Sequence, residues 1–221
     1  MRTQELQIPA AGVNLGADVV VPEQARGVVL FAHGSGSSRH SPRNRFVAAE
    51  LQQAGLATML ADLLTPEEEQ LDQPSGHLRF DIGLLSVRLA ALTDFLTEHE
   101  ETADLDVGLF GASTGAAAAL VAAAGRPDAV RAVVSRGGRP DLAGESLRLV
   151  RQPTLLIVGE LDEVVIDLNR KALALLAGER RLVIVPGASH LFTEPGTLEQ
   201  VARLATDWFQ RVLGPGRTIQ Q

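Results

Sequence analysis

The sequence Asp106-Val107-Gly108-Leu109-Phe110-Gly111-Ala112-Ser113-Thr114-Gly115 ends an apolar run with the pattern Gly-x-Ser-x-Gly. The apolar part has strand character, and the alanine-rich run that follows has helical character. The stretch therefore predicts a strand, a sharp turn and a helix, with Ser113 at the apex. Such a turn strains the backbone of the apical residue, and side chains at Gly111 and Gly115 would collide. We expect the Ser113 hydroxyl to be exposed at a helix N-terminus, where it can attack a carbonyl group.

The pattern alone does not decide the function. The chain contains 21 glycines, and Gly-x-Ser-x-Gly can also be a tight crossing of a strand and a helix with a solvated serine. A general base and an acid placed downstream, in the right structural positions, would favour nucleophilic catalysis over this alternative.

The flanking sequence alternates between strand and helix patterns. Two N-terminal strands, joined by a turn near Pro9 to Gly12, predict an antiparallel edge. Apolar runs predict buried strands over 27–32, 56–61, 130–135, 154–159 and 181–186, and periodic segments predict helices over 43–54, 80–98, 165–176 and 198–213. This alternation predicts a doubly wound, mostly parallel α/β sheet in a single domain, residues 1–221. Thr65 to Asp72 reads as a solvated loop or short helix, and Gly214 begins a tail that we expect to be frayed.

Polar side chains follow the predicted buried strands again and again. Ligands of such sheets bind outside the carboxyl ends of the strands, so these residues should share one crevice. Among them Ser113, Asp162 and His190 occur in the chain order nucleophile, acid, base. We expect His190 to take the Ser113 proton and return it to the leaving group, and Asp162 to fix the imidazole tautomer.

Other residues near these positions were weighed for the same roles. Glu160 is the alternative acid if Asp162 does not face His190, and Glu163 and Asp167 compete more weakly. The backbone N–H groups of Thr114 and Ser35 are the expected donors of an oxyanion hole. His33 is expected to shape the oxyanion loop by hydrogen bonds, whereas surface or helix-capping roles are expected for three other histidines, His40, His77 and His99.

Composition excludes several classes of function. A net charge of −7 argues against nucleic acid as a partner, and the absence of cysteine excludes disulfides and thiolate metal sites. No set of His, Asp and Glu has metal-ligand spacing, so we predict neither a metal nor a cofactor. The N-terminal residues lack a continuous apolar segment, and no run is long enough to span a membrane. We expect a cytoplasmic monomer or homodimer.

Four short motifs together resemble the α/β-hydrolase superfamily over nearly the whole chain, and within it the small, lidless, dienelactone hydrolase-like branch. The motifs are Ala32-His33-Gly34-Ser35-Gly36-Ser37-Ser38, Gly111-Ala112-Ser113-Thr114-Gly115, Gly159-Glu160-Leu161-Asp162 and Gly187-Ala188-Ser189-His190. The resemblance implies an eight-stranded sheet and ester hydrolysis through an acyl-enzyme. Dienelactone hydrolases themselves use a cysteine nucleophile, so Ser113 puts a dienelactone substrate in doubt.

Only residues 136–153 separate the sixth strand from the strand that carries the acid, so a large cap is not expected. An open site favours small esters, with a thioester or amide, or a non-catalytic ligand-binding role, as alternatives. Substrate carboxylates can bind to arginines by paired hydrogen bonds. The arginines expected near the crevice are Arg39, Arg43, Arg136 and Arg139, unless they are solvated or pair with Glu67, Glu68, Glu69 and Asp72.

Overall fold

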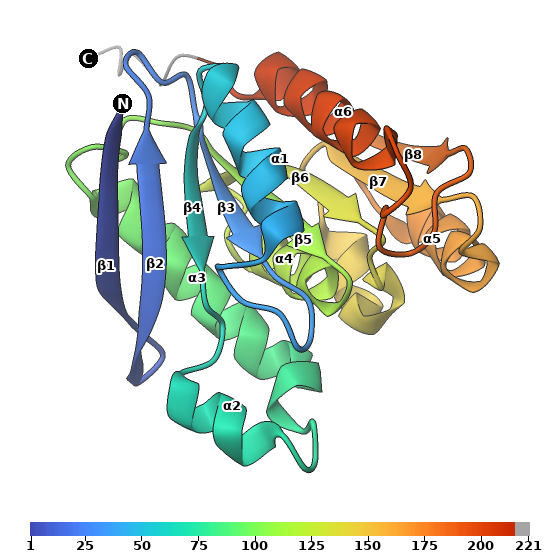
Figure 1. The fold of residues 1–221 in the computed structure, drawn as a ribbon, viewed down its shortest axis with the longest axis horizontal. Helices are drawn as coiled ribbons and strands as arrows, with labels where there is room; N and C mark the ends of the chain where they lie inside the picture. Colours follow the sequence, from blue (N-terminus) through green and yellow to red (C-terminus); the bar gives the residue numbers. More distant parts are fainter. Residues whose placement is uncertain (215–221) are drawn as a thin grey trace.

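A computed structural model describes residues 1–214 and contains one eight-stranded sheet (Figure 1). The strand order is β1-β2-β4-β3-β5-β6-β7-β8, with β3 to β8 all parallel. The sheet confirms the predicted doubly wound, mostly parallel α/β class. The strands are β1 (Arg2–Ala10), β2 (Val13–Val21), β3 (Val28–Ala32), β4 (Ala57–Ala61), β5 (Val107–Ala112), β6 (Val130–Arg136), β7 (Thr154–Gly159) and β8 (Arg180–Val185).

The N-terminal hairpin forms the antiparallel edge that the sequence predicts. Strands β1 and β2 pair along their whole length, from Arg2 opposite Val21 to Ala10 opposite Val13. Ala11 and Gly12 at the turn both have positive φ, as a tight hairpin turn requires. Strand β2 then pairs antiparallel with β4, which joins the hairpin to the parallel part of the sheet.

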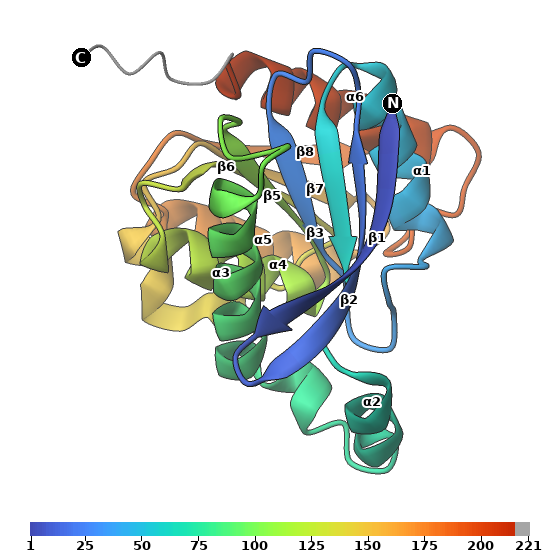
Figure 2. The same ribbon diagram turned by 90° about the vertical axis from the view of Figure 1, so that its left-hand side faces the viewer.

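Helices cover both faces of the sheet, and Figure 2 shows α3 and α1 on opposite sides of it. One face packs against α1 and α6, and the other packs against α3 and α4 with part of α5. The observed helices agree closely with the predicted ranges. They are α1 (Pro42–Gln53), α2 (Pro66–Asp72), α3 (Ile82–Glu98), α4 (Thr114–Gly125), α5 (Glu163–Leu175) and α6 (Thr197–Val212), with 3-10 segments η1 (Leu78–Phe80) and η2 (Pro140–Leu149).

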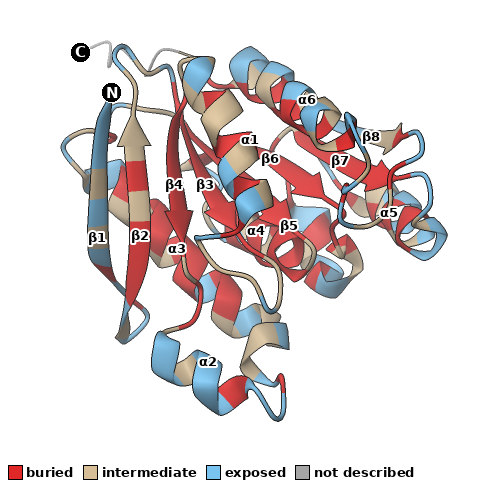
Figure 3. Cartoon of the chain, viewed as in Figure 1, coloured by how far each residue is buried: buried red, intermediate tan, exposed pale blue. Residues whose placement is uncertain are grey.

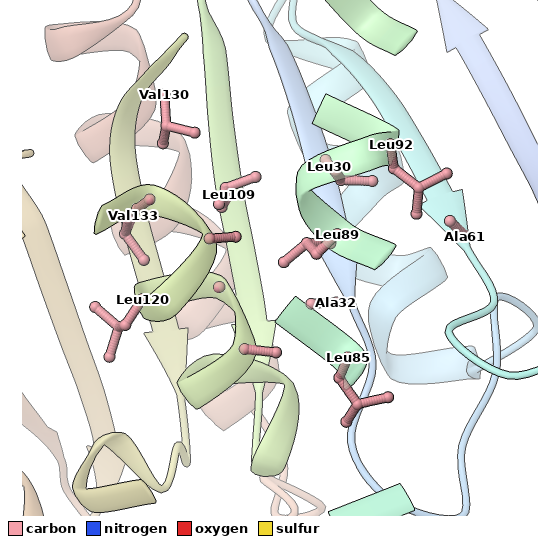
Figure 4. Close-up of a cluster of buried hydrophobic side chains, with 14 of the residues drawn as sticks. Leu30, Ala32, Ala61, Leu85, Leu89, Leu92, Leu109, Leu120, Val130 and Val133 are labelled. Carbon is pink, nitrogen blue, oxygen red and sulfur yellow. The ribbon is translucent and has the colours of Figure 1, made fainter. Parts of the chain in front are cut away.

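The central strands are buried on both faces, which explains their unbroken apolar sequences (Figure 3). In the larger core, leucines from α3 lie against residues of β3 and β4, while Leu120 of α4 lies against β5 and β6 (Figure 4). Alanines fill most of α4, so this helix can approach the sheet closely directly behind Ser113.

The register of the parallel strands brings their carboxyl ends to one edge of the sheet. Ala32 at the end of β3 lies opposite Gly111 of β5, and Ala112 lies opposite Arg136 at the end of β6. The residues that follow these strands therefore surround Ser113. The N-terminal end of α1 lies at the same edge (Figure 1).

The acidic segment after β4 is the short helix α2, which projects beyond the carboxyl end of that strand (Figure 1). The short helix is one of the two forms that the sequence analysis expected, but its Asp72 is only 2% exposed and is therefore not solvated. The Asp72 carboxylate accepts hydrogen bonds from the N–H groups of Leu78 and Arg79 and from the Arg79 guanidinium. Arg88 of α3 donates hydrogen bonds to both carboxylate oxygens of Glu68 in α2, which fixes α2 to α3.

No helix within residues 1–214 is long and apolar enough to cross a membrane. The tail expected from Gly214 falls, beyond that residue, outside the described part of the chain.

Candidate active site

Ser113 lies between β5 and α4 with φ of 50° and ψ of −121°, a strained conformation for a residue with a side chain. A Cβ at Gly111 would collide with the backbone of Ala116. One at Gly115 would collide with the carbonyl oxygens of Ala32 and His33. Both glycines are therefore required for the turn, as the sequence predicts, although Gly115 clears the end of β3 rather than the strand that carries Ser113. Strain of this kind persists only where the surrounding structure holds it.

Residues 33–38 follow β3 and contain Ser35, one of the predicted oxyanion donors, so we call them the oxyanion loop. This loop is held by His33, which is 6% exposed. The His33 Nε2 accepts the N–H of Leu63 at 3.0 Å, and its Nδ1 lies 3.0 Å from the carbonyl oxygen of Gly34. These contacts fix a neutral ring protonated on Nδ1 and confirm the structural role expected for His33. Burial lowers the pKa of this imidazole.

The loop brings the two predicted oxyanion donors, Ser35 and Thr114, next to each other. The N–H of Ser35 donates a hydrogen bond to the Thr114 hydroxyl, with 2.9 Å between N and Oγ1. No sequence pattern predicts this contact, which joins residues 79 positions apart. An incoming oxyanion would compete with the Thr114 hydroxyl for the Ser35 N–H group.

Asp162 and His190, which follow β7 and β8, meet at the same edge of the sheet. The Asp162 Oδ2 lies 2.6 Å from the His190 Nδ1, a short and charge-assisted distance. This contact leaves Nε2 as the nitrogen available for proton transfer. Among the hydrogen bonds of the described residues, none joins this ring to Ser113. Such contacts are often long until substrate binds.

Two further carboxylates hold the loop that carries His190. Glu160, the alternative acid, accepts the N–H of Gly187 at 2.8 Å and does not contact the imidazole. Glu194 accepts the N–H of Ser189 at 2.9 Å, and this hydrogen bond lowers the pKa of its carboxyl group. The sequence analysis missed Glu194, because a glutamate four residues after a histidine has no signature of its own.

The loop after β6 supports Ser113 through its backbone. The N–H of Ser113 donates to the carbonyl oxygen of Arg136 at 3.3 Å, and the N–H of Arg139 donates to that of Ser113 at 3.1 Å. The buried Asn169 of α5 donates to the Gly138 carbonyl at 3.0 Å, which ties this loop to the helix after Asp162. Asn169 is a second positioning residue that the sequence did not reveal.

The arginines expected to bind substrate divide into two kinds. The Arg39 guanidinium is bound by three carboxylates, those of Glu5, Asp18 and Asp62. Likewise, Arg139 forms a paired contact with Asp141. Each of the three guanidinium nitrogens of Arg39 thus donates to a carboxylate, which argues against the expectation that Arg39 binds substrate.

The other two arginines, Arg43 and Arg136, have no carboxylate partner among the ion pairs of residues 1–214. Nor do they pair with the acids of α2, two of which bind Arg79 and Arg88 instead.

A cavity of about 350 Å³ lies between the oxyanion loop and α2. Ser35 and Thr114 line the cavity, and Leu63, Leu64 and Leu85 supply apolar walls. Glu69 also lines it, and burial, followed by the charge of Asp62, raises the pKa of the Glu69 carboxyl group. The cavity has the size and mixed lining of a site for a small organic molecule.

Known proteins of similar structure share this architecture. A dienelactone hydrolase from Anabaena variabilis is 59% identical, with a TM-score of 0.94 over 96% of this chain and 98% of that chain. A lidless α/β serine hydrolase from Xanthomonas campestris has a TM-score of 0.75 at 21% identity, over 95% of this chain and 94% of that one. The second similarity shows the fold alone, an α/β-hydrolase fold without a lid.

Two strains of Mycobacterium tuberculosis contain proteins named "Putative phosphoribosyl transferase" that are 58% identical over 217 residues. These matches cover 98% of this chain but only 48% of the relatives, so the chain spans about half their length. Residues 15–214 match the dienelactone hydrolase family. Both this match and the Anabaena structure lead to one conclusion: the chain belongs to the dienelactone hydrolase family.

Proposed function

We propose that this protein is a serine hydrolase that cleaves small carboxylic esters through an acyl-enzyme. The observation that carries the proposal is the 2.6 Å contact between Asp162 and His190 at the sheet edge that also exposes the strained Ser113. A serine, a carboxylate and an imidazole are the groups that nucleophilic acyl transfer needs.

In the proposed reaction, His190 Nε2 accepts the proton of Ser113 as Oγ attacks the ester carbonyl carbon. Asp162 stabilises the imidazolium that forms. The carbonyl oxygen becomes an oxyanion, which the N–H groups of Thr114 and Ser35 would bind. The imidazolium then protonates the alcohol as it leaves. Water attacks the acyl-Ser113 ester in the second half, with His190 again acting as the base.

A serine in place of the cysteine nucleophile of dienelactone hydrolases makes general-base assistance essential, because a serine hydroxyl is almost never ionised at neutral pH. The same groups can cleave thioesters or amides, which remain alternative substrates. The name of the Mycobacterium relatives describes proteins about twice as long as the match. The contact between Asp162 and His190 supports hydrolysis, so we propose hydrolysis for this chain rather than phosphoribosyl transfer.

The test compares hydrolysis of p-nitrophenyl acetate and butyrate by the wild type and by Ser113→Ala. We expect the variant to lose nearly all activity, and the wild-type kcat/KM to rise with pH through an apparent pKa typical of histidine. A fluorophosphonate probe should label the wild type at Ser113 alone. An inactive wild type that also resists the probe would refute the proposal and favour a ligand-binding role.

A further inference from the structure

The side chain of Arg136 begins beside the candidate catalytic residues. Its own carbonyl oxygen accepts the N–H of Ser113, and the next residue, Gly137, packs against His190, where an added Cβ would lie 3.1 Å from the histidine carbonyl oxygen. Arg136 is the last residue of β6, directly opposite Ala112 of β5. The Arg136 side chain is therefore attached to a backbone segment that directly contacts Ser113.

This guanidinium is buried with unused donors. Arg136 is 7% exposed. Its Nη2 donates a long hydrogen bond, 3.4 Å, to the Asn44 side chain, whereas Nε and Nη1 have no partner within the described chain. Burial of a charged group without hydrogen bonds is costly, so proteins normally satisfy such groups. The unused N–H groups of Arg136 are thus suited to an anionic ligand.

A second cation adds to the same place. The half-buried Arg43 lies in the first turn of α1, next to Asn44, and its buried Nε also lacks a partner among residues 1–214. Burial and then the charge of Arg43 lower the pKa of Arg136 to about 10. The N-terminal end of α1 contributes a further positive potential.

Two neighbouring arginines, unlike Arg43 and Arg136, form ion pairs with carboxylates. Arg39 contacts three carboxylates, and Arg45, two positions along α1 from Arg43, pairs with Asp18. The protein has a net charge of −7, so acidic side chains are plentiful. A shortage of acidic residues therefore does not explain why Arg43 and Arg136 have no carboxylate partner within residues 1–214.

We propose that Arg43 and Arg136 form an anion-binding site for a carboxylate or phosphate group carried by the substrate of Ser113. This inference rests on the proposed hydrolase function and deepens it, because it predicts an ester that carries a second, anionic group. Guanidinium groups recognise both kinds of anion through charge-assisted hydrogen bonds. The anion would lie on the α1 side of the sheet, whereas the cavity beside α2 lies on the α3 side.

The catalytic test measures kcat/KM for monomethyl succinate and for methyl butyrate, which lacks the acid. A second pair compares 2-acetoxyethyl phosphate with ethyl acetate. We expect Arg136→Gln and Arg43→Gln each to lower the ratio of kcat/KM for the anionic ester to kcat/KM for the neutral ester by about tenfold or more. The loss should come mainly from a higher KM for the anionic ester. The control is Arg45→Gln, which removes an exposed arginine of the same helix and should leave the ratio unchanged. Equal loss on both members of each pair would overturn the site.

A binding test separates this inference from the proposed hydrolysis. Titration calorimetry of Ser113→Ala with succinate and with inorganic phosphate should detect one site, weakened about tenfold or more by adding Arg136→Gln or Arg43→Gln. Arg43 lies on the helix surface, so its variant decides the matter if Arg136→Gln fails to fold. Binding of one anion alone identifies the group recognised. If the protein binds an anion but cleaves no ester, only the proposed hydrolase activity is refuted. If it binds neither anion, the proposed anion-binding site is refuted.

Discussion

Replacing Arg136 by methionine should make the folded protein more stable at neutral pH. A fall in the pKa of Arg136 from its ordinary value to about 10 means that burial and Arg43 disfavour the charged form in the folded state. The difference corresponds to about 3 kcal/mol of free energy of unfolding, which an uncharged side chain would regain. Methionine has similar length and flexibility, so it can fill the same space.

The opposing term is the lost hydrogen bond to Asn44. At 3.4 Å it contributes at most about 1 kcal/mol. The free energy of unfolding of Arg136→Met should therefore exceed that of the wild type by about 2 kcal/mol, which raises Tm by roughly 4–8 °C for a chain of this size. The free-energy penalty on the wild type is fully present below the folded pKa of about 10 and is lost as pH rises above that value. The advantage of Arg136→Met should therefore shrink in alkaline solution.

The assay is urea denaturation of wild type and variant at neutral pH, in a buffer free of phosphate and carboxylates, followed by the same comparison at alkaline pH. Added phosphate should narrow the difference, because a ligand that binds the folded wild type stabilises it. A variant less stable than the wild type by more than about 1 kcal/mol would show that Arg136 has compensating contacts and refute the reasoning.

Three further outcomes are expected. Asp162→Asn should lower kcat for p-nitrophenyl acetate by about 10⁴-fold with little change in KM, because the amide favours the wrong tautomer of His190; a loss below about tenfold would remove Asp162 from the triad. Thr114→Val should leave kcat within about fivefold of the wild type, because the oxyanion replaces the hydroxyl as acceptor for Ser35; a larger loss would make the hydroxyl a donor to the oxyanion. The urea midpoint of the wild type should fall relative to His33→Gln as pH drops below about 6.5, since the lowered pKa keeps the folded imidazole neutral while the unfolded chain takes up a proton; parallel curves would contradict this.

The sheet and helices could be predicted closely because their signals are local. Continuous apolar runs identified β3 to β7 within a few residues, and the turn at Ser113 follows from two glycines whose side chains would meet backbone atoms. Ser113, Asp162 and His190 each follow a predicted buried strand, which predicts that they lie at one sheet edge. Each of these signals comes from a short stretch of sequence around the residue concerned.

Contacts between distant side chains could not be predicted in the same way. Arg39 meets carboxylates from β1, β2 and the end of β4, and this combination depends on strand order and register. The burial of Asp72 depends on how the chain turns back after α2 to offer N–H groups. The same limitation hid Glu194 and Asn169, since hydrogen bonds to backbone groups leave no pattern in the sequence.

The contact between Ser35 and the Thr114 hydroxyl is compatible with the proposed oxyanion hole. The Thr114 hydroxyl accepts the Ser35 N–H while no oxyanion is present. Breaking this hydrogen bond costs about 1 kcal/mol. A donor aimed at a developing oxyanion lowers the barrier by about 3–4 kcal/mol. Exchange of the hydroxyl for the oxyanion is therefore favourable in the transition state, whereas an uncharged ester carbonyl gains little from it. The Ser35 N–H would thus favour the transition state over the bound substrate, which is the difference that accelerates a reaction.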